Sequence, residues 1–126
     1  MEILVEILAA RILIRPTDPA RSLSFYRDVL GLAVAREFPG GTVFFLGGGY
    51  LELSGSADTP AGPAVALWLQ VRDLAAAHRE LAEHVVREPR REPWGLHEMW
   101  ITDPDGTRIV LVEVPPDHPL RRDDRS

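Results

Sequence analysis

The same order of predicted elements occurs twice along this chain, and this repeat constrains the fold more than any other feature. Each copy has a helix-start signal, Asp18 followed by Pro19 in the first copy and Asp73 in the second. Asp18 and Asp73 are 55 positions apart, as are Tyr26 and Leu81. Repetition at one spacing predicts two copies of a single supersecondary unit.

The first copy reads as a strand, a helix and three further strands. Leu23, Tyr26 and Leu30 recur at helical spacing after Asp18, and Gly31 can take the left-handed turn that ends a helix. Alternating apolar residues and turn signals predict the strands, with Gly47 to Gly49 as the last turn. The expected ranges are 8–15 for the first strand, 19–30 for the helix, and 32–38, 42–46 and 50–55 for the three strands.

The second copy follows a linker at 56–63 that is rich in small residues, Pro and Gly. We expect one domain over 1–126, with module one at about 8–55, module two at about 64–114 and an extended tail at 115–126. The elements predicted in module two are a strand at 64–72, a helix capped by Asp73, a strand from Val85 that runs into a charged loop at 87–93, and strands at 97–102 and 108–114.

The spacing also predicts which positions of the two modules are equivalent. We expect one offset throughout, with a single insertion of three residues in the second module's last hairpin. This places Arg11 on Ala66 and Phe45 on Trp100 at an offset of 55, and Glu52 on Val110 at 58.

Composition narrows the class of protein. A chain of 126 residues with 45% hydrophobic residues can bury a real core, and its net charge of -5 without a basic stripe argues against nucleic acid as a partner. Cysteine is absent, which removes disulfides and thiol chemistry. All basic residues are Arg, a usage that points to a GC-rich, bacterial genome.

Residues 1–10 match neither a signal peptide nor a membrane span, so we expect no membrane association and a cytoplasmic location.

Two motifs resemble a known superfamily. The first helix reads RPTDPARSLSFYRDVLGL, and the last hairpin reads DPDGTRIVLVE. Together with the paired modules, they resemble the vicinal oxygen chelate superfamily, which includes glyoxalase I, extradiol dioxygenases, fosfomycin-resistance enzymes and bleomycin-resistance proteins. The resemblance covers about residues 8–114 and implies an α+β fold of two βαβββ modules with a cupped mixed sheet. Pro93-Trp94-Gly95 ahead of Glu98 and Asp103-Pro104 looks most like the bleomycin-resistance branch.

The resemblance also indicates where a metal ion would bind, and the residues at four positions show whether this chain has the ligands. In the metalloenzymes of the superfamily, the first and last strand of each module supply His, Gln or Glu ligands. The matching positions here are Arg11, Glu52, Ala66 and Val110. Only Glu52 has a metal-binding atom, so we expect neither a metal nor another cofactor, with Arg11 paired to Glu52 instead.

Strand alternation extends this set to the residues that should face the cup. They describe a cavity with aromatic walls and a few charges, suited to a planar or amphipathic small molecule. Trp68 and Trp100 could instead fill a core or a subunit interface, and Trp94 could form a lid or a dimer contact. The candidate ligand-binding residues are Arg11, Leu13, Phe45, Tyr50, Glu52, Trp68, Gln70, Trp94, Glu98, Trp100 and Arg108.

Three functions stay open at this point. The first is metal-independent binding of a small organic molecule, as in drug or metabolite sequestration, by a homodimer. The second is a glyoxalase-like lyase or isomerase, or a dioxygenase, with an unrecognised metal site or a metal-free acid-base mechanism. The third is a dimeric interaction module whose own side chains fill the cup.

No histidine site is indicated, because His97 and Glu98 face opposite ways, and His78 and His84 are six positions apart.

Overall fold

The computed structural model describes residues 5–121. The chain divides into two compact units, residues 1–59 and 60–126, which we describe one at a time. No helix among the described residues is long and apolar enough to cross a membrane. The single-domain organisation predicted above remains a prediction.

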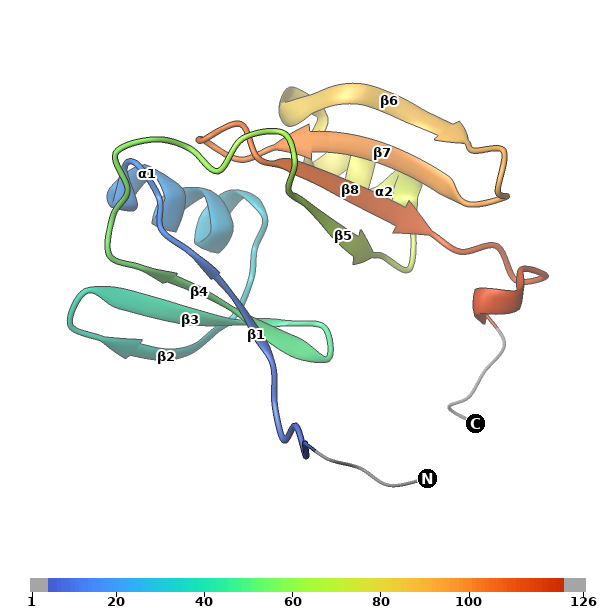
Figure 1. Ribbon diagram of the computed structural model, residues 1–126. Helices are drawn as coiled ribbons and strands as arrows, with labels where there is room; N and C mark the ends of the chain where they lie inside the picture. The colour runs from blue at the N-terminus through green and yellow to red at the C-terminus, as the bar shows by residue number, and fades with distance from the viewer. Residues whose placement is uncertain (1–4, 122–126) are drawn as a thin grey trace. The chain divides into compact units, whose positions relative to one another are not determined.

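Unit one is a four-stranded mixed sheet with one helical segment (Figure 1). The strand order is β1-β4-β3-β2; β1 runs parallel to β4, and the other pairs are antiparallel. Helix α1 continues directly into the π-helical turn η1. The bounds are β1 Arg11–Ile14, α1 Pro19–Ser24, η1 Phe25–Val29, β2 Val34–Phe38, β3 Gly41–Leu46 and β4 Gly49–Ser54.

Unit two repeats this topology with the strand order β5-β8-β7-β6. Its parallel pair is β5 and β8, and its helix α2 is followed by the short 3-10 turn η2. The bounds are β5 Ala66–Gln70, α2 Leu74–Glu80, η2 Ala82–His84, β6 Val85–Arg91, β7 His97–Thr102, β8 Arg108–Glu113 and η3 Pro119–Arg121. Both units are therefore βαβββ modules, which confirms the predicted α+β fold class.

Both helices begin at the predicted caps. The Asp18 carboxylate accepts the Arg21 amide at 3.2 Å, and the Asp73 carboxylate accepts the Ala76 amide at 3.0 Å. Pro19 occupies the first turn of α1, where its missing N–H leaves no intrahelical bond unmade. These local signals set where each helix starts.

Several fully buried side chains of each unit lie on one face of its sheet or on its helical segment. In unit one, Tyr26 of η1, Phe44 of β3 and Leu51 of β4 are fully buried. In unit two, Met99 and Ile101 of β7 and Ile109 of β8 are fully buried, and α2 packs against β6, β7 and β8. Because side chains alternate along a strand, Glu98 and Trp100 lie on the opposite face from Met99.

The strand registers confirm the duplication. The parallel strand pair has the same alignment in both units. This confirms the predicted offsets, which are 55 between the first strands of the two modules and 58 between their last strands. The equivalent cross-strand pairs are Arg11 with Tyr50 and Ala66 with Arg108, then Leu13 with Glu52 and Trp68 with Val110.

One predicted equivalence is wrong. Trp100 pairs with Val110 as Val43 pairs with Glu52, so Trp100 corresponds to Val43 at an offset of 57, and Phe45 is two positions out. The register also makes Arg36 and Arg87 equivalent, since Arg36 pairs with Val43 and Arg87 with Trp100. The offset therefore changes at more than one loop, so a single insertion does not describe the repeat. Insertions in surface loops cost a fold little stability.

The charged segment from Arg87 is another correction. We predicted a loop over 87–93, whereas β6 extends to Arg91 and pairs with β7. Strand β6 lies at the edge of its sheet, where charged side chains can point to solvent while the backbone pairs on one side. Backbone pairing with β7 thus stabilises this segment as a strand, although its charged composition is unusual for one.

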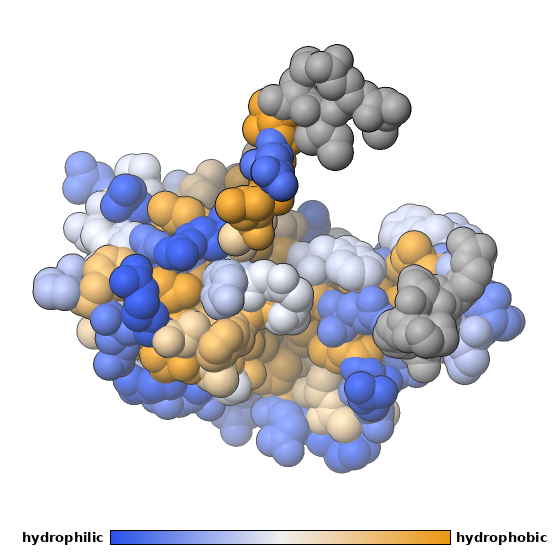
Figure 2. All heavy atoms as spheres, turned by 90° about the horizontal axis from the view of Figure 1, so that it is seen from below, coloured by the Kyte–Doolittle hydropathy of each residue, from blue (hydrophilic) through white to orange (hydrophobic). Residues whose placement is uncertain are grey.

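The two ends of the described chain differ from the prediction. The first strand begins at Arg11, three residues later than predicted, and the preceding segment contains the exposed side chains of Val5, Ile7 and Leu8. Figure 2 draws the apolar side chains of this segment in orange. In the tail, Pro119–Arg121 forms a 3-10 turn, so the extended conformation predicted there is wrong at that point. The last five residues of the predicted tail, 122–126, lie outside the described residues.

Candidate ligand-binding site

Five of the candidate residues lie on one face of the unit-one sheet. Arg11 is paired with Tyr50, Leu13 with Glu52, and Phe45 also with Tyr50, so alternation places all five on the same side. The rings of Phe45 and Tyr50 are 5.7 Å apart, centroid to centroid. Leu13 and Phe45 are about half exposed, which leaves apolar surface available on this face.

The Arg11–Glu52 pair forms as predicted and includes a third residue. Arg11 Nη1 donates to Glu52 Oε1 at 2.7 Å, and the Ser54 hydroxyl donates to Oε2 at 2.8 Å. The Ser54 hydrogen bond, followed by that of Arg11, holds the pKa of Glu52 below its ordinary value. Both oxygens of this carboxylate are therefore engaged within the unit.

In unit two, two guanidinium groups lie close to the ring of Trp100. Arg87 is 4.2 Å from the centre of the indole ring, and Arg108 is 4.5 Å from it. Both distances are in the range of favourable cation–π contacts. Tryptophan attracts cations more strongly than phenylalanine or tyrosine does. We call Arg87, Trp100 and Arg108 the Trp100 platform; it lies beside a buried apolar cluster formed by Leu96, Val110, Val112 and Val114.

A buried carboxylate fixes one side of the platform. Arg87 forms an ion pair with Glu92, whose side chain is almost completely buried, and also donates to the Glu98 carbonyl at 3.1 Å. The hydrogen bond from Arg87 holds the pKa of Glu92 below its ordinary value, against the effect of burial. Glu92 thereby keeps its charge and restrains Arg87 over the ring.

The loop residue Trp94 is tied to a predicted site residue. Its indole N–H donates to Glu98 Oε2 at 2.8 Å, and Glu98 is only 6% exposed. The His118 ring forms a hydrogen bond with the Trp94 carbonyl at 3.0 Å, so the loop is held from the tail as well. The Trp94 side chain nonetheless remains 58% exposed.

The structure thus brings some of the predicted residues together within each unit. In unit two, Trp100 meets Arg108 and Trp94 meets Glu98, while Trp68 and Gln70 are aligned with Val110 and Val112 on β8. Trp68 is half exposed, as expected for a residue that can meet a ligand.

Sequence reasoning missed Ser54, Arg87 and Glu92. Ser54 was detectable, because it lies two positions from Glu52 and so shares its face. Arg87 was not, because its alignment with Trp100 depends on a register shift in β6 that no local pattern indicates.

The four superfamily metal positions do not fit a divalent ion. Glu52 has both oxygens hydrogen-bonded, Arg11 is a cation, Ala66 has no donor atom, and Val110 belongs to the apolar cluster. Between residues 5 and 121, no group of three or more His, Asp or Glu side chains is arranged to hold a metal ion.

The comparisons with known proteins give the class. The model of the Glyoxalase/Bleomycin resistance protein/Dioxygenase superfamily matches residues 8–111, so the chain belongs to that superfamily. The resemblance inferred from the two motifs is thereby confirmed. The search of curated proteins found no match.

Solved structures support the same fold. A glyoxalase/bleomycin resistance protein/dioxygenase from Nocardioides is 18% identical, with a TM-score of 0.74, covering 93% of this chain and 90% of that one. A protein of unknown function from Agrobacterium tumefaciens is 24% identical, with a TM-score of 0.71, covering 89% and 98%. A glyoxalase-related enzyme from Fulvimarina pelagi is 21% identical, with a TM-score of 0.70, covering 88% and 90%. At these identities, the likeness is one of fold.

Proposed function

We propose that this protein binds a small organic molecule without a metal ion and acts by sequestration. The observation that carries the proposal is the chemistry of the four superfamily metal positions, where the one carboxylate, Glu52, is neutralised by Arg11 and bonded by Ser54. A metal ion there would have to displace the Arg11 cation from Glu52 and gain ligands that the other three positions lack. Binding through aromatic and guanidinium groups needs neither change.

The Trp100 platform indicates the chemistry of the ligand. Two guanidinium groups lie close to the indole, and Arg108 is exposed, so a planar ligand can stack against the Arg108 guanidinium. The indole N–H of Trp100 and the Nε–H of Arg87 are buried, with no acceptor among the described residues. A ligand oxygen or an ordered water would satisfy such donors. These features favour a planar molecule that carries acceptor or anionic groups.

Two exposed tryptophans supply apolar contact area. Trp68 is 50% exposed on β5, and Trp94 is 58% exposed at the β6–β7 connection. Aromatic side chains of this kind bind flat ligands through large contact areas at small entropic cost. We include Trp68 and Trp94 with Arg11, Glu52 and Trp100 as the contacts on which the proposal depends.

The proposal also includes an organisation. We propose a single-domain, cytoplasmic, bacterial protein that acts as a homodimer. Its structural neighbours come from bacteria such as Nocardioides and Agrobacterium tumefaciens, which supports the bacterial part. The homodimer follows from the superfamily resemblance and is tested by the mass of the protein in solution.

Elemental analysis tests the metal-independent part. The protein is purified without chelators or a metal-binding tag, analysed, and analysed again after addition of divalent ions and desalting. We expect close to no metal in both samples. A value near one ion per chain would overturn the proposal and place the lyase, isomerase or dioxygenase function first. Ligands are then screened by tryptophan fluorescence, with Trp68→Phe and Trp94→Phe variants to locate the responding ring.

A further inference from the structure

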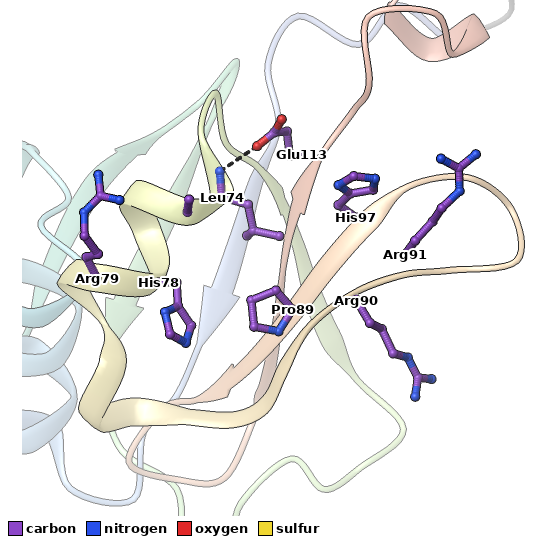
Figure 3. A pocket seen from close by; sticks show the side chains of 9 residues that line it. Leu74, His78, Arg79, Pro89, Arg90, Arg91, His97 and Glu113 are labelled. Atoms are coloured by element: carbon purple, nitrogen blue, oxygen red, sulfur yellow. Dashed lines mark hydrogen bonds between the residues drawn. The ribbon is translucent and has the colours of Figure 1, made fainter.

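A hollow lies between the helix and the sheet of unit two, on the face opposite the Trp100 platform. It has a volume of about 480 Å³ and opens between the start of α2 and the ends of three strands (Figure 3). It is lined by Leu74, Ala75, His78, Arg79, Pro89, Arg90, Arg91, His97 and Glu113. A space of this size accommodates a small organic molecule.

Unit one has a hollow of about 410 Å³ at the equivalent place. The helix caps and the strand registers relate five positions of the two linings, so the repeat itself provides an internal comparison. Pro19 and Ala20 correspond to Leu74 and Ala75, while Leu23, Gly40 and Gly55 correspond to His78, His97 and Glu113. The fold therefore makes a hollow in both modules, and only module two lines it with titratable side chains.

Three of the polar residues form a row across the sheet. His97 of β7 is directly paired with Arg91 of β6 on one side and Glu113 of β8 on the other. Cross-strand partners point to the same face, which here is the face that carries α2. Figure 3 shows the His97 ring between the Glu113 carboxylate and the Arg91 side chain. The row presents a cation, an imidazole and a carboxylate in that order.

The row keeps unused hydrogen-bonding capacity. Glu113 Oε1 accepts the Leu74 amide at 2.8 Å, which orients the carboxylate and leaves its second oxygen for another donor. Among residues 5–121, Arg91 forms no ion pair, whereas Arg90 lies 3.5 Å from Glu92 and His78 lies 2.8 Å from Glu88. Arg79 of α2 also forms no ion pair with a described residue, but Arg91 is the one that belongs to the row, so it is the cation that can bind an anion beside His97.

We propose that this hollow is a second ligand site, for a small carboxylate that also carries a hydrogen-bond donor. The ligand carboxylate pairs with Arg91, and its hydroxyl or amino group donates to the second oxygen of Glu113, with His97 between them. Leu74 and Pro89 cover the apolar body. The fixed negative charge of Glu113 disfavours a doubly charged phosphate, which separates this ligand class from phosphate esters.

The test is an NMR titration of the full chain with 4-hydroxybenzoate, which has both groups. We expect shifts at the amides of Leu74 and His97, with little change at the Trp100 indole. Benzoate lacks the donor, and 4-hydroxybenzamide lacks the charge, so each should bind at least about tenfold more weakly. Because Arg91 is exposed, the Arg91→Gln variant should fold. Its affinity for 4-hydroxybenzoate should be lower than that of the parent protein by a similar factor. Arg21→Gln, an exposed substitution on α1, should leave the affinity unchanged.

Three outcomes would overturn this second site. They are an absence of shifts at Leu74 and His97, equal affinity for 4-hydroxybenzoate and 4-hydroxybenzamide, and unchanged affinity in Arg91→Gln. A response confined to the Trp100 indole would remove the second site while supporting the proposed function. The two proposals can therefore fail independently.

Discussion

Arg11 Nη1 donates to Glu52 Oε1 at 2.7 Å, from one edge strand of the unit-one sheet to the strand beside it. The guanidinium is 40% exposed and the carboxylate 13% exposed, so the pair is open to solvent on one side. A pair in this position can meet a ligand, and its solvent contact limits what it adds to folding.

Arg11→Ala should therefore weaken ligand binding more than it lowers the melting temperature. The measurements are ligand affinity by fluorescence titration and thermal unfolding of the same samples. Arg27→Ala is the matched control, because Arg27 pairs with Asp28 at 2.9 Å on the surface and is not a predicted ligand contact. A large loss of stability with unchanged affinity would make the Arg11–Glu52 pair structural.

Acid should destabilise the protein partly through Glu92. Its pKa is lowered from the ordinary value of 4.5 by the hydrogen bond from Arg87, so the ionised form is favoured in the folded state. This contribution is present above the ordinary pKa and is lost as the pH falls through the folded-state pKa. Glu92→Gln should lower the melting temperature at neutral pH, and the difference from the parent protein should shrink as the pH falls below the ordinary pKa of 4.5. A difference independent of pH would contradict the charge-based reason.

The Trp94–Glu98 hydrogen bond should contribute to stability. Trp94→Phe removes the indole donor while the Glu98 carboxylate stays almost buried, and an unpaired buried acceptor of this kind costs about 1–3 kcal/mol. Denaturant unfolding gives this value. Trp68→Phe, at a half-exposed position, should change the unfolding free energy by about 0.5 kcal/mol or less. Equal effects of the two substitutions would show that the hydrogen bond adds nothing.

The core of unit two should depend strongly on Met99. Its side chain is fully buried on the helix-covered face of β7, and truncation to alanine leaves a cavity, with an expected cost of about 2–5 kcal/mol. Val86→Ala is the comparison, because Val86 is 58% exposed on β6. We expect a change of about 0.5 kcal/mol or less there. A small effect of Met99→Ala would mean that the helix-covered face is packed differently.

Much of the fold followed from local signals in the sequence. Asp18 and Asp73 start helices because their side chains accept free amides of the first turn, a short-range effect that needs no tertiary contact. Alternation then placed Arg11 and Glu52 on one face, and the pair forms. Short-range hydrogen bonding and side-chain periodicity are properties of the chain itself, so they can be read before it folds.

The tertiary structure decided what depends on strand pairing. The register of β6 against β7 brings Arg87 onto Trp100 and places Arg91 beside His97. This register includes shifts of the kind made by bulges, which respond to the energy of the whole sheet and leave little trace in local composition. Long-range pairing therefore completed both the platform and the second hollow, whereas the sequence alone determined the modules that carry them.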